Sequence, residues 1–204
     1  MLNEQRTGPI AAQDGAVNPA RSDRQGAGVI TAGHGKYNEA VIRGKAFIAA
    51  NQAAVTTTAA GGLGLANTGL CVSNPPGSEH NLSILKVGWA WSVAPAAVSS
   101  VHLAGGYVAT GGVTGHTTPL VVYNLKLGAP GVSVAFADGA ATIVGPVYLH
   151  PLIGGFTLGT LFAQPMALTD IGGSIIVPPG GYVCIVTLTT GDGFGAIAWE
   201  EIPI

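Results

Sequence analysis

The side chains best suited to holding a metal ion are widely separated along this chain. Its five histidines are His34, His80, His102, His116 and His150, and no two of them lie within four residues. Zinc sites that can be recognised from a sequence have closely spaced ligands, such as two histidines on one turn of a helix or on one face of a strand. We therefore predict no metal ion and no cofactor. A convergence of His102, His116 and His150 in the folded chain stays open as an alternative.

Carboxylates that could act together as acid and base are also scarce. After position 45 the acidic residues are Glu79, Asp138, Asp170, Asp192, Glu200 and Glu201. The three aspartates stand close to glycines, in turn-like contexts that favour local hydrogen bonding. Glu200 and Glu201 are adjacent at the end of a predicted strand, so their side chains should point to opposite faces.

Motifs of nucleophilic and phosphate-transfer enzymes are missing as well. There is no Gly-x-Ser-x-Gly elbow and no phosphate-binding loop ending in Gly-Lys-Ser or Gly-Lys-Thr. We predict that the protein is not an enzyme. A hydrolase or metal enzyme built on a β-sandwich is kept as a minor third class, which metal analysis and a hydrolase panel would test.

The two cysteines, Cys71 and Cys184, are far apart in the sequence, and each lies within an apolar run. A free thiol in such a run behaves as a small hydrophobic side chain. We predict two buried free thiols, with a disulfide as the alternative.

From Tyr37 onward the chain consists of short β-prone runs separated by turn residues, which is typical of a sandwich or barrel. Turn chemistry is clearest at 74–77, 128–131, 138–139 and 178–181, where proline or aspartate adjoins glycine. Helices are not expected between Gly69 and Ile204, and Ala46 to Ala60 is interpreted as a strand end followed by a loop. The predicted strands are Tyr37–Ala50, Gly69–Ser73, Leu82–Val93, Val101–Ala109, Leu120–Leu127, Val132–Ala137, Ala141–Leu149, Thr157–Gln164, Ser174–Val177, Tyr182–Thr189 and Gly195–Ile202.

The clearest alternation runs through Leu82–Val93. One face would carry Ser83, Leu85, Val87, Trp89, Trp91 and Val93. A bulky aromatic face of this kind indicates a strand beside a core. The two tryptophans are therefore interpreted as core residues rather than as stacking platforms for a ligand.

Charge divides the chain into an arm, residues 1–36, and a body, residues 37–204. The first 45 residues hold six basic and four acidic side chains, a net charge of +2, while the rest hold two basic and six acidic ones, a net charge of −4. The apolar residues before position 36 follow no strand or helix period, so this segment cannot form a core alone. We expect an extended arm that docks on a partner through basic side chains, namely Arg6, Arg21, Arg24, Lys36, Arg43 and Lys45. A terminus without a role is the alternative.

Several partners are disfavoured by composition. No unbroken apolar stretch reaches the roughly 18 residues that a spanning helix needs, so no membrane insertion is expected. The first ten residues lack the apolar core of a secretion signal. Lys86 and Lys126 are the only basic residues after position 45, so specific nucleic-acid binding is not expected.

Scarcity of charge points instead to assembly. Only 9% of the residues are charged and 48% are hydrophobic, whereas charged residues usually make up about 25% of a soluble domain. Isolated monomers rely on surface charge to stay apart. We expect much of the body's surface to be covered by companion subunits in a closed oligomer.

Three segments resemble jelly-roll structural proteins of tailed bacteriophages, especially head decoration or cement proteins. They are Leu82 to Val93, the Ile-Ile-Val-Pro-Pro-Gly-Gly-Tyr-Val-Cys-Ile stretch from Ile175, and Ala-Ile-Ala-Trp-Glu-Glu near the end. The resemblance implies a jelly-roll-like antiparallel β-sandwich, a homotrimer, and binding to the major capsid protein or another virion protein on the outside of an assembled head. The protein would be made in the host cytoplasm and would end on the capsid surface. No catalytic residue is implied.

The main alternative is a head-fibre or tail receptor-binding module of the same kind of virus. Its loops, rather than its arm, would recognise a glycan or protein on the host surface.

Overall fold

The structure is a computed structural model that describes residues 36–57, 66–93, 99–107, 113–114, 118–128, 132–156 and 167–204. The body begins at Glu39, where a boundary separates it from the preceding unit. The predicted arm, apart from Lys36, lies outside the described residues. No helix within the described ranges is long and apolar enough to cross a membrane.

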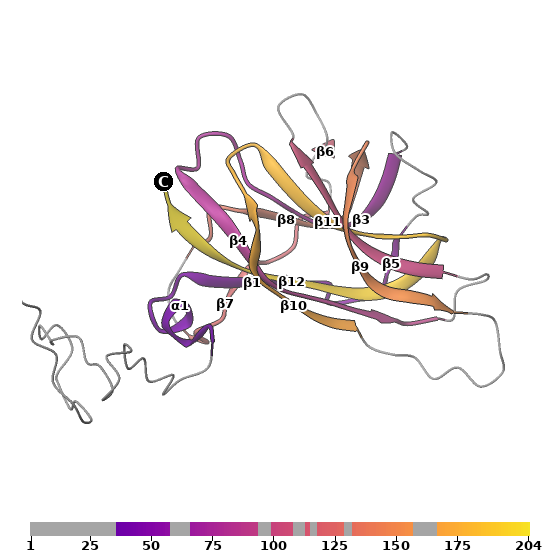
Figure 1. Cartoon of the computed structure of the whole chain (residues 1–204), viewed down its shortest axis with the longest axis horizontal. Coiled ribbons are helices and arrows are strands. Elements are labelled where there is room, and N and C mark those ends of the chain that lie inside the picture. The colour runs from indigo at the N-terminus through magenta and orange to yellow at the C-terminus, as the bar shows by residue number, and fades with distance from the viewer. Residues whose placement is uncertain are drawn as a thin grey trace, which may run out of the picture. The chain divides into compact units, whose positions relative to one another are not determined.

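The described residues of the body form two six-stranded antiparallel sheets (Figure 1). The first sheet has the order β10-β4-β12-β1-β7, with β2 pairing along β12, and the second has the order β6-β8-β3-β11-β5-β9. In chain order the strands are β1 (Ala46–Ala50), β2 (Val55–Thr57), β3 (Ala66–Ser73), β4 (His80–Trp91), β5 (Ser99–Tyr107), β6 (Val113–Thr114), β7 (Tyr123–Asn124), β8 (Phe136–Val144), β9 (Val147–Phe156), β10 (Ala167–Val177), β11 (Gly181–Thr187) and β12 (Gly191–Pro203).

Four nested strand pairs define the topology. β1 pairs with β12, β3 with β11, β4 with β10, and β5 with β9. Each pair therefore encloses the next one in the sequence, from the ends of the chain towards its middle. This rolled arrangement over two sheets is a jelly roll. The predicted all-β, jelly-roll-like antiparallel sandwich is confirmed. β6, β7 and β8 lie in the connection from β5 to β9 and extend the two sheets beside β3 and β1.

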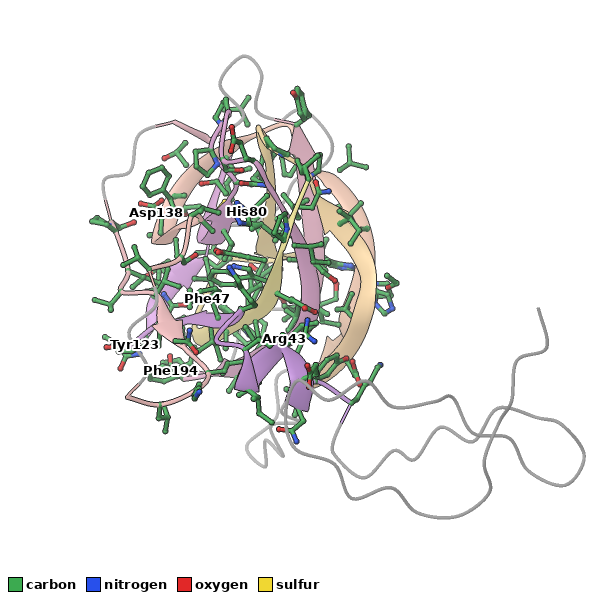
Figure 2. All side chains as sticks on the ribbon, turned by 90° about the vertical axis from the view of Figure 1, so that its left-hand side faces the viewer. Arg43, Phe47, His80, Tyr123, Asp138 and Phe194 are labelled. Atoms are coloured by element: carbon green, nitrogen blue, oxygen red, sulfur yellow. The ribbon has the colours of Figure 1, made fainter. Side chains whose placement is uncertain are left out.

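Apolar side chains from both sheets fill the space between them. Trp89 and Trp199 are 1% and 0% exposed, and the ring of Phe47 stacks on that of Trp199 with centroids 6.3 Å apart. Figure 2 shows Phe47 between the two sheets. Burying each side chain of this size contributes about 2–3 kcal/mol to folding. The interpretation of Trp89 and Trp91 as core residues is therefore confirmed.

The predicted face of Leu82–Val93 is only partly correct. Ile84 pairs with Trp199 and Lys86 with Ala198, so Leu85 is an extra residue in β4. This β-bulge reverses the alternation on its N-terminal side. Leu82 and Ile84 consequently face the core, in place of Ser83 and Leu85.

A helix replaces the first part of the predicted strand Tyr37–Ala50. α1 (Asn38–Ile42) starts at an asparagine and carries Glu39 in its first turn. Gly44 follows the end of the helix, and its φ of 67° is the left-handed conformation that closes many helices. The segment Asn-Glu-Ala-Val-Ile-Arg-Gly contains these start and stop signals, and β1 follows from Ala46 as expected.

The predicted turn at Asp138-Gly139 is wrong, because both residues lie inside β8. The amide of Gly139 donates to the carbonyl of Thr118, and the amide of Ala140 donates to the Thr118 hydroxyl. These bonds satisfy two backbone amides at an irregularity in the pairing of β8 with β3, and the chain does not reverse there. The reversal comes instead at Gly145, with φ 63°.

The predicted single strand Ala141–Leu149 is wrong, because it contains the end of β8, the reversal at Gly145 and the start of β9. Other strand predictions differ mainly in extent. Leu120–Leu127 holds only the two-residue β7, whereas Ser174–Val177 extends backward to Ala167 as β10. β2 lies in the segment interpreted as a loop. Thr157–Gln164 lies outside the described residues.

Candidate functional site

Half of the basic residues predicted to bind a partner fall outside the described structure. These are Arg6, Arg21 and Arg24. Lys36 is described, and its Nζ lies 5.2 Å from the centroid of the Tyr37 ring. A cation at that distance over an aromatic face is weakly attracted to it.

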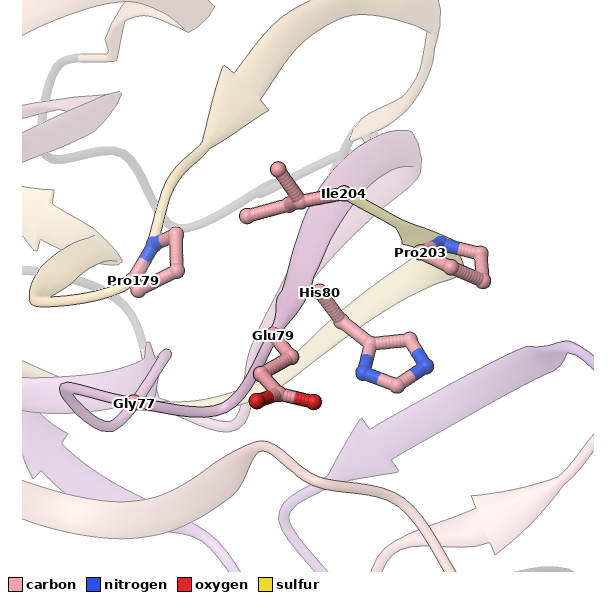
Figure 3. Close-up of a pocket in the computed structure, with 6 residues that line it drawn as sticks. All are labelled: Gly77, Glu79, His80, Pro179, Pro203 and Ile204. Atoms are coloured by element: carbon pink, nitrogen blue, oxygen red, sulfur yellow. The ribbon is translucent and has the colours of Figure 1, made fainter.

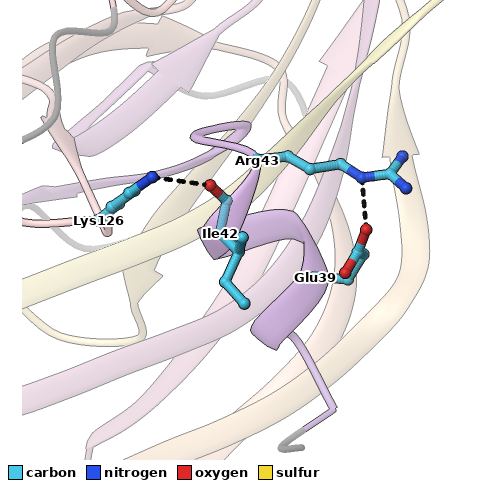
Figure 4. Close-up of polar contacts among 4 residues, drawn as sticks. All are labelled: Glu39, Ile42, Arg43 and Lys126. Atoms are coloured by element: carbon cyan, nitrogen blue, oxygen red, sulfur yellow. Dashed lines mark hydrogen bonds and ion pairs between the residues drawn. The ribbon is translucent and has the colours of Figure 1, made fainter. Parts of the chain in front are cut away.

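Arg43 belongs to a small network around α1 (Figure 4). Its Nε donates to Oε1 of Glu39 at 2.6 Å, and both side chains are 70% exposed. Lys126 Nζ donates to the carbonyl of Ile42 at 3.1 Å, at the end of α1 where a cation is favoured. Lys45 is exposed beside β1. Exposed ion pairs contribute only about 0–1 kcal/mol, so these cations remain accessible to an anionic partner.

An open pocket of about 590 Å³ lies where three segments meet at one end of the body (Figure 3). The segments are the β3–β4 loop, the β10–β11 turn and the end of β12. The lining residues are Gly77, Glu79, His80, Pro179, Pro203 and Ile204.

Glu79 is held in an unusual backbone conformation at this pocket. Its φ is 57°, in the left-handed region that non-glycine residues rarely occupy. The carbonyl of Glu79 accepts a hydrogen bond from the amide of Ile204 at 3.1 Å. Such strain persists where surrounding contacts fix the backbone, and it is more frequent at functional sites.

Asn74 fixes the two loops that form the pocket. Its side chain is 1% exposed, and Nδ2 donates to the carbonyls of His80 at 2.7 Å and Val177 at 3.0 Å. Its backbone exchanges two further hydrogen bonds with Gly180 and Gly181. The Asn-Pro-Pro-Gly sequence predicted a turn here, but nothing in it indicated this clamp.

The described side chains at this pocket offer polar contacts to a bound group. The His80 Nδ1 lies 2.8 Å from the carbonyl of Ser78, and the Glu79 carboxylate can pair with a cation or accept hydrogen bonds. The described lining residues therefore combine one imidazole and one carboxylate with two prolines, a glycine and an isoleucine.

No group of three or more histidine, cysteine, aspartate or glutamate side chains in the described part of the chain could hold a metal ion. His102 instead stacks on Tyr148, with ring centroids 5.0 Å apart, and its Nε2 lies 2.7 Å from the hydroxyl of Ser100. Partial burial lowers the pKa of His102. The Nδ1 of His150 contacts the carbonyl of Pro151 at 2.6 Å. The convergence of His102 with His116 is not tested, because His116 lies outside the described residues.

Glu201 and Glu200 differ in their surroundings. Glu201 is 4% exposed, and its Oε1 accepts hydrogen bonds from the Ser133 hydroxyl at 2.5 Å and the Val134 amide at 2.9 Å. Glu200 is partly exposed. Glu201 therefore ties the segment before β8 to β12, a role that the sequence did not indicate.

The outward side of the first sheet forms a second candidate surface, which we call the outer face. Two rows of register partners cross it, Ala50-Ala196-Gly88-Leu168 and Ile48-Ala198-Lys86-Asp170. An apolar hollow of about 270 Å³ opens on the first row. Phe194 and Leu168, 43% and 64% exposed, flank it. Figure 2 shows Phe194 and Tyr123 on the outside of the sandwich.

Comparison with protein families, with characterised proteins and with solved structures finds no match to this chain. The function is therefore argued from the two candidate surfaces and from the fold.

Proposed function

We propose that this protein is a structural module that self-associates and docks on the outside of a larger particle, as a decoration or cement protein on an assembled phage head. The major capsid protein or another virion protein would be its partner. The protein would be made in the host cytoplasm and would reside on the capsid surface. The resemblance to phage jelly-roll proteins supports this assignment, and a trimer is the oligomer that it suggests.

The imbalance between apolar and charged side chains on the surface carries the proposal. Asp138 and Glu201 are buried, so the surface of the body is even poorer in charge than the sequence suggests. Leu168, Ile176, Phe194 and Ile202 share the outer face and are 64%, 48%, 43% and 41% exposed. Large exposed apolar patches on soluble proteins usually mark sites of interaction.

Stabilisation of a shell requires no chemistry from this chain. A protein that binds the assembled lattice and not its free subunits shifts the equilibrium toward the lattice by mass action. Many copies, each with a modest interface, would multiply the effect through multivalency. The exposed cations Arg43 and Lys45, with the basic residues of the arm, would contact acidic groups of the shell.

The test measures the mass of the purified chain alone and its co-sedimentation with assembled heads that lack it. We expect an oligomer that binds heads and raises the temperature at which they disrupt. Deleting residues 1–35 should leave a folded, oligomeric body that no longer binds. Unchanged binding after the deletion would contradict the role of the arm. A wild-type chain that is monomeric and does not bind heads would contradict the whole proposal.

A second candidate function, recognition of a host-surface molecule, is favoured by the pocket around Glu79. Its strained backbone and the buried Asn74 clamp give a preformed polar site at a loop end, as binding sites often have. Binding of the chain to host cells, lost in Glu79→Gln and retained in the control Glu200→Gln, would support this function over decoration. Equal cell binding by both variants would exclude the pocket.

A further inference from the structure

We propose that a second copy of this chain docks on the outer face, in a reciprocal contact around a two-fold axis centred near the Gly88 hollow. This inference rests on the proposed self-association and names the surface that mediates it. Symmetric two-fold contacts use the same patch on both subunits.

The shape of the hollow fits a reciprocal contact. Its floor is formed by small residues, among them Gly88, Ala90 and Ala196, whereas Leu168 and Phe194 rise beside it. A two-fold axis next to the hollow would place Leu168 of each copy over the floor of the other. The volume of about 270 Å³ accommodates one large apolar side chain.

Charges on the outer face are few and self-complementary. Lys86 is the register partner of Asp170 on β10 and of Ala198 on β12, and Glu200 lies on the same face of β12, two residues beyond Ala198. Among the described residues of this face, one cation lies beside two carboxylates, so two copies can approach each other without a strong like-charge repulsion. The net charge of the outer face is too small to select a strongly charged partner. Opposing like charges across an apolar contact would be unfavourable, and a face with few charges avoids this when it meets its own copy.

The area is sufficient for a specific contact. The strands β10, β4, β12, β1 and β7 have 11, 12, 13, 5 and 2 residues. At about 4.8 Å between strands and about 3.4 Å per residue, they give a face of roughly 700 Å². Specific interfaces bury at least about 1,200 Å² in total, or about 600 Å² from each partner. The apolar surface continues along the face through Ile176 and Ile202, which are 48% and 41% exposed.

The test combines a charge substitution with a cross-link. Leu168 is exposed on an edge strand, so Leu168→Lys should fold, and circular dichroism with thermal melting would establish this. We expect wild type to have an even copy number, as a dimer or as paired trimers, and Leu168→Lys to have half that mass by light scattering. Phe194→Lys should behave in the same way. Leu188→Lys, at a 48% exposed leucine between β11 and β12, is the matched control and should keep the wild-type mass.

Cross-linking tests the two-fold axis directly. A short bis-maleimide should join two copies of Leu168→Cys, because residues on facing sheets about 10 Å apart are within its reach but too far apart for a disulfide. Wild type and Leu188→Cys should not be cross-linked, because Cys71 and Cys184 are buried and residue 188 lies outside the contact. An oligomer whose mass and cross-linking are unaffected by changes at Leu168 would overturn the proposed interface while leaving self-association intact. A monomeric wild type would overturn both.

Discussion

Cys184 on β11 lies directly opposite Cys71 on β3. Both residues are free thiols, 0% and 1% exposed, in a small cluster separate from the main core. The neighbouring Val72 and Val183 belong to the main core, so the thiols occupy the opposite face of the same sheet. The predicted buried free thiols are confirmed.

Both thiols should be unreactive in the native protein. Burial raises the pKa of Cys71 and of Cys184, and the thiolate is the reactive form. We expect no labelling by Ellman's reagent at pH 8 within an hour, and two thiols per chain after unfolding in guanidinium. Rapid labelling of the native protein would show that this side of the second sheet opens readily.

Stability should fall in alkali. Because the folded pKa values are raised, the folded chain keeps its thiol protons while the unfolded chain releases them above about pH 8.5. Above that pH, each thiol lowers the free energy of unfolding by up to about 1.4 kcal/mol per pH unit. The thiol contribution is fully present below that pH. Denaturation midpoints from pH 7 to 10 should decline in wild type, and less steeply in Cys71→Ala. The same slope in both would show that other groups cause the decline.

Relieving the backbone strain at Glu79 should stabilise the fold. Glycine adopts a φ of 57° without the steric cost that a β-carbon brings, about 1 kcal/mol. Glu79→Gly should therefore raise the free energy of unfolding by about 0.5–1 kcal/mol in urea denaturation. Gly77→Ala is the converse control, because it adds a β-carbon at a φ of 79° where nothing lies within 4 Å to clash with it. The backbone strain alone should then lower the free energy of unfolding by about 1 kcal/mol. Destabilisation by Glu79→Gly would mean that the side chain makes a structural contribution.

Removing the Asn74 clamp should be costly. Asn74→Ala leaves the buried carbonyl of Val177 without its side-chain donor and also loses the bond to His80, for a loss of about 2–4 kcal/mol. Asn81→Ala, at a partly exposed position on β4, should change stability by less than about 0.5 kcal/mol. Chemical denaturation measures both, and equal effects would contradict the clamp.

The same substitution should affect stability at Glu201 but not at Glu200. Glu201→Ala removes the acceptor for Ser133 and Val134 in a buried position, which should cost about 2–3 kcal/mol. Glu200→Ala should be nearly neutral in stability. A comparable loss in both variants would mean that Glu201 is not specifically required.

Local sequence patterns determined the strand content, most strand positions and the core role of the tryptophans, because alternation and turn residues act over a few neighbouring positions. The left-handed glycines Gly77 and Gly180 mark two of the predicted turns. By contrast, Gly191 and Gly193 were not assigned to a strand, although both lie in β12. An added β-carbon at either would meet the ring of Trp91 or Trp89 at 2.4 or 2.3 Å, a packing relation set by a strand a hundred residues away.

By itself the sequence determined that this is a charge-poor, predominantly β chain, and it predicted the two buried thiols. Only the tertiary structure decided which strands pair, where the β4 bulge reverses the faces, and which residues meet at the Glu79 pocket and on the outer face. The pocket joins the β3–β4 loop to segments about a hundred or more positions later in the chain, and the outer face joins five strands from separate parts of the chain. Their proximity depends on strand register, which no local pattern encodes.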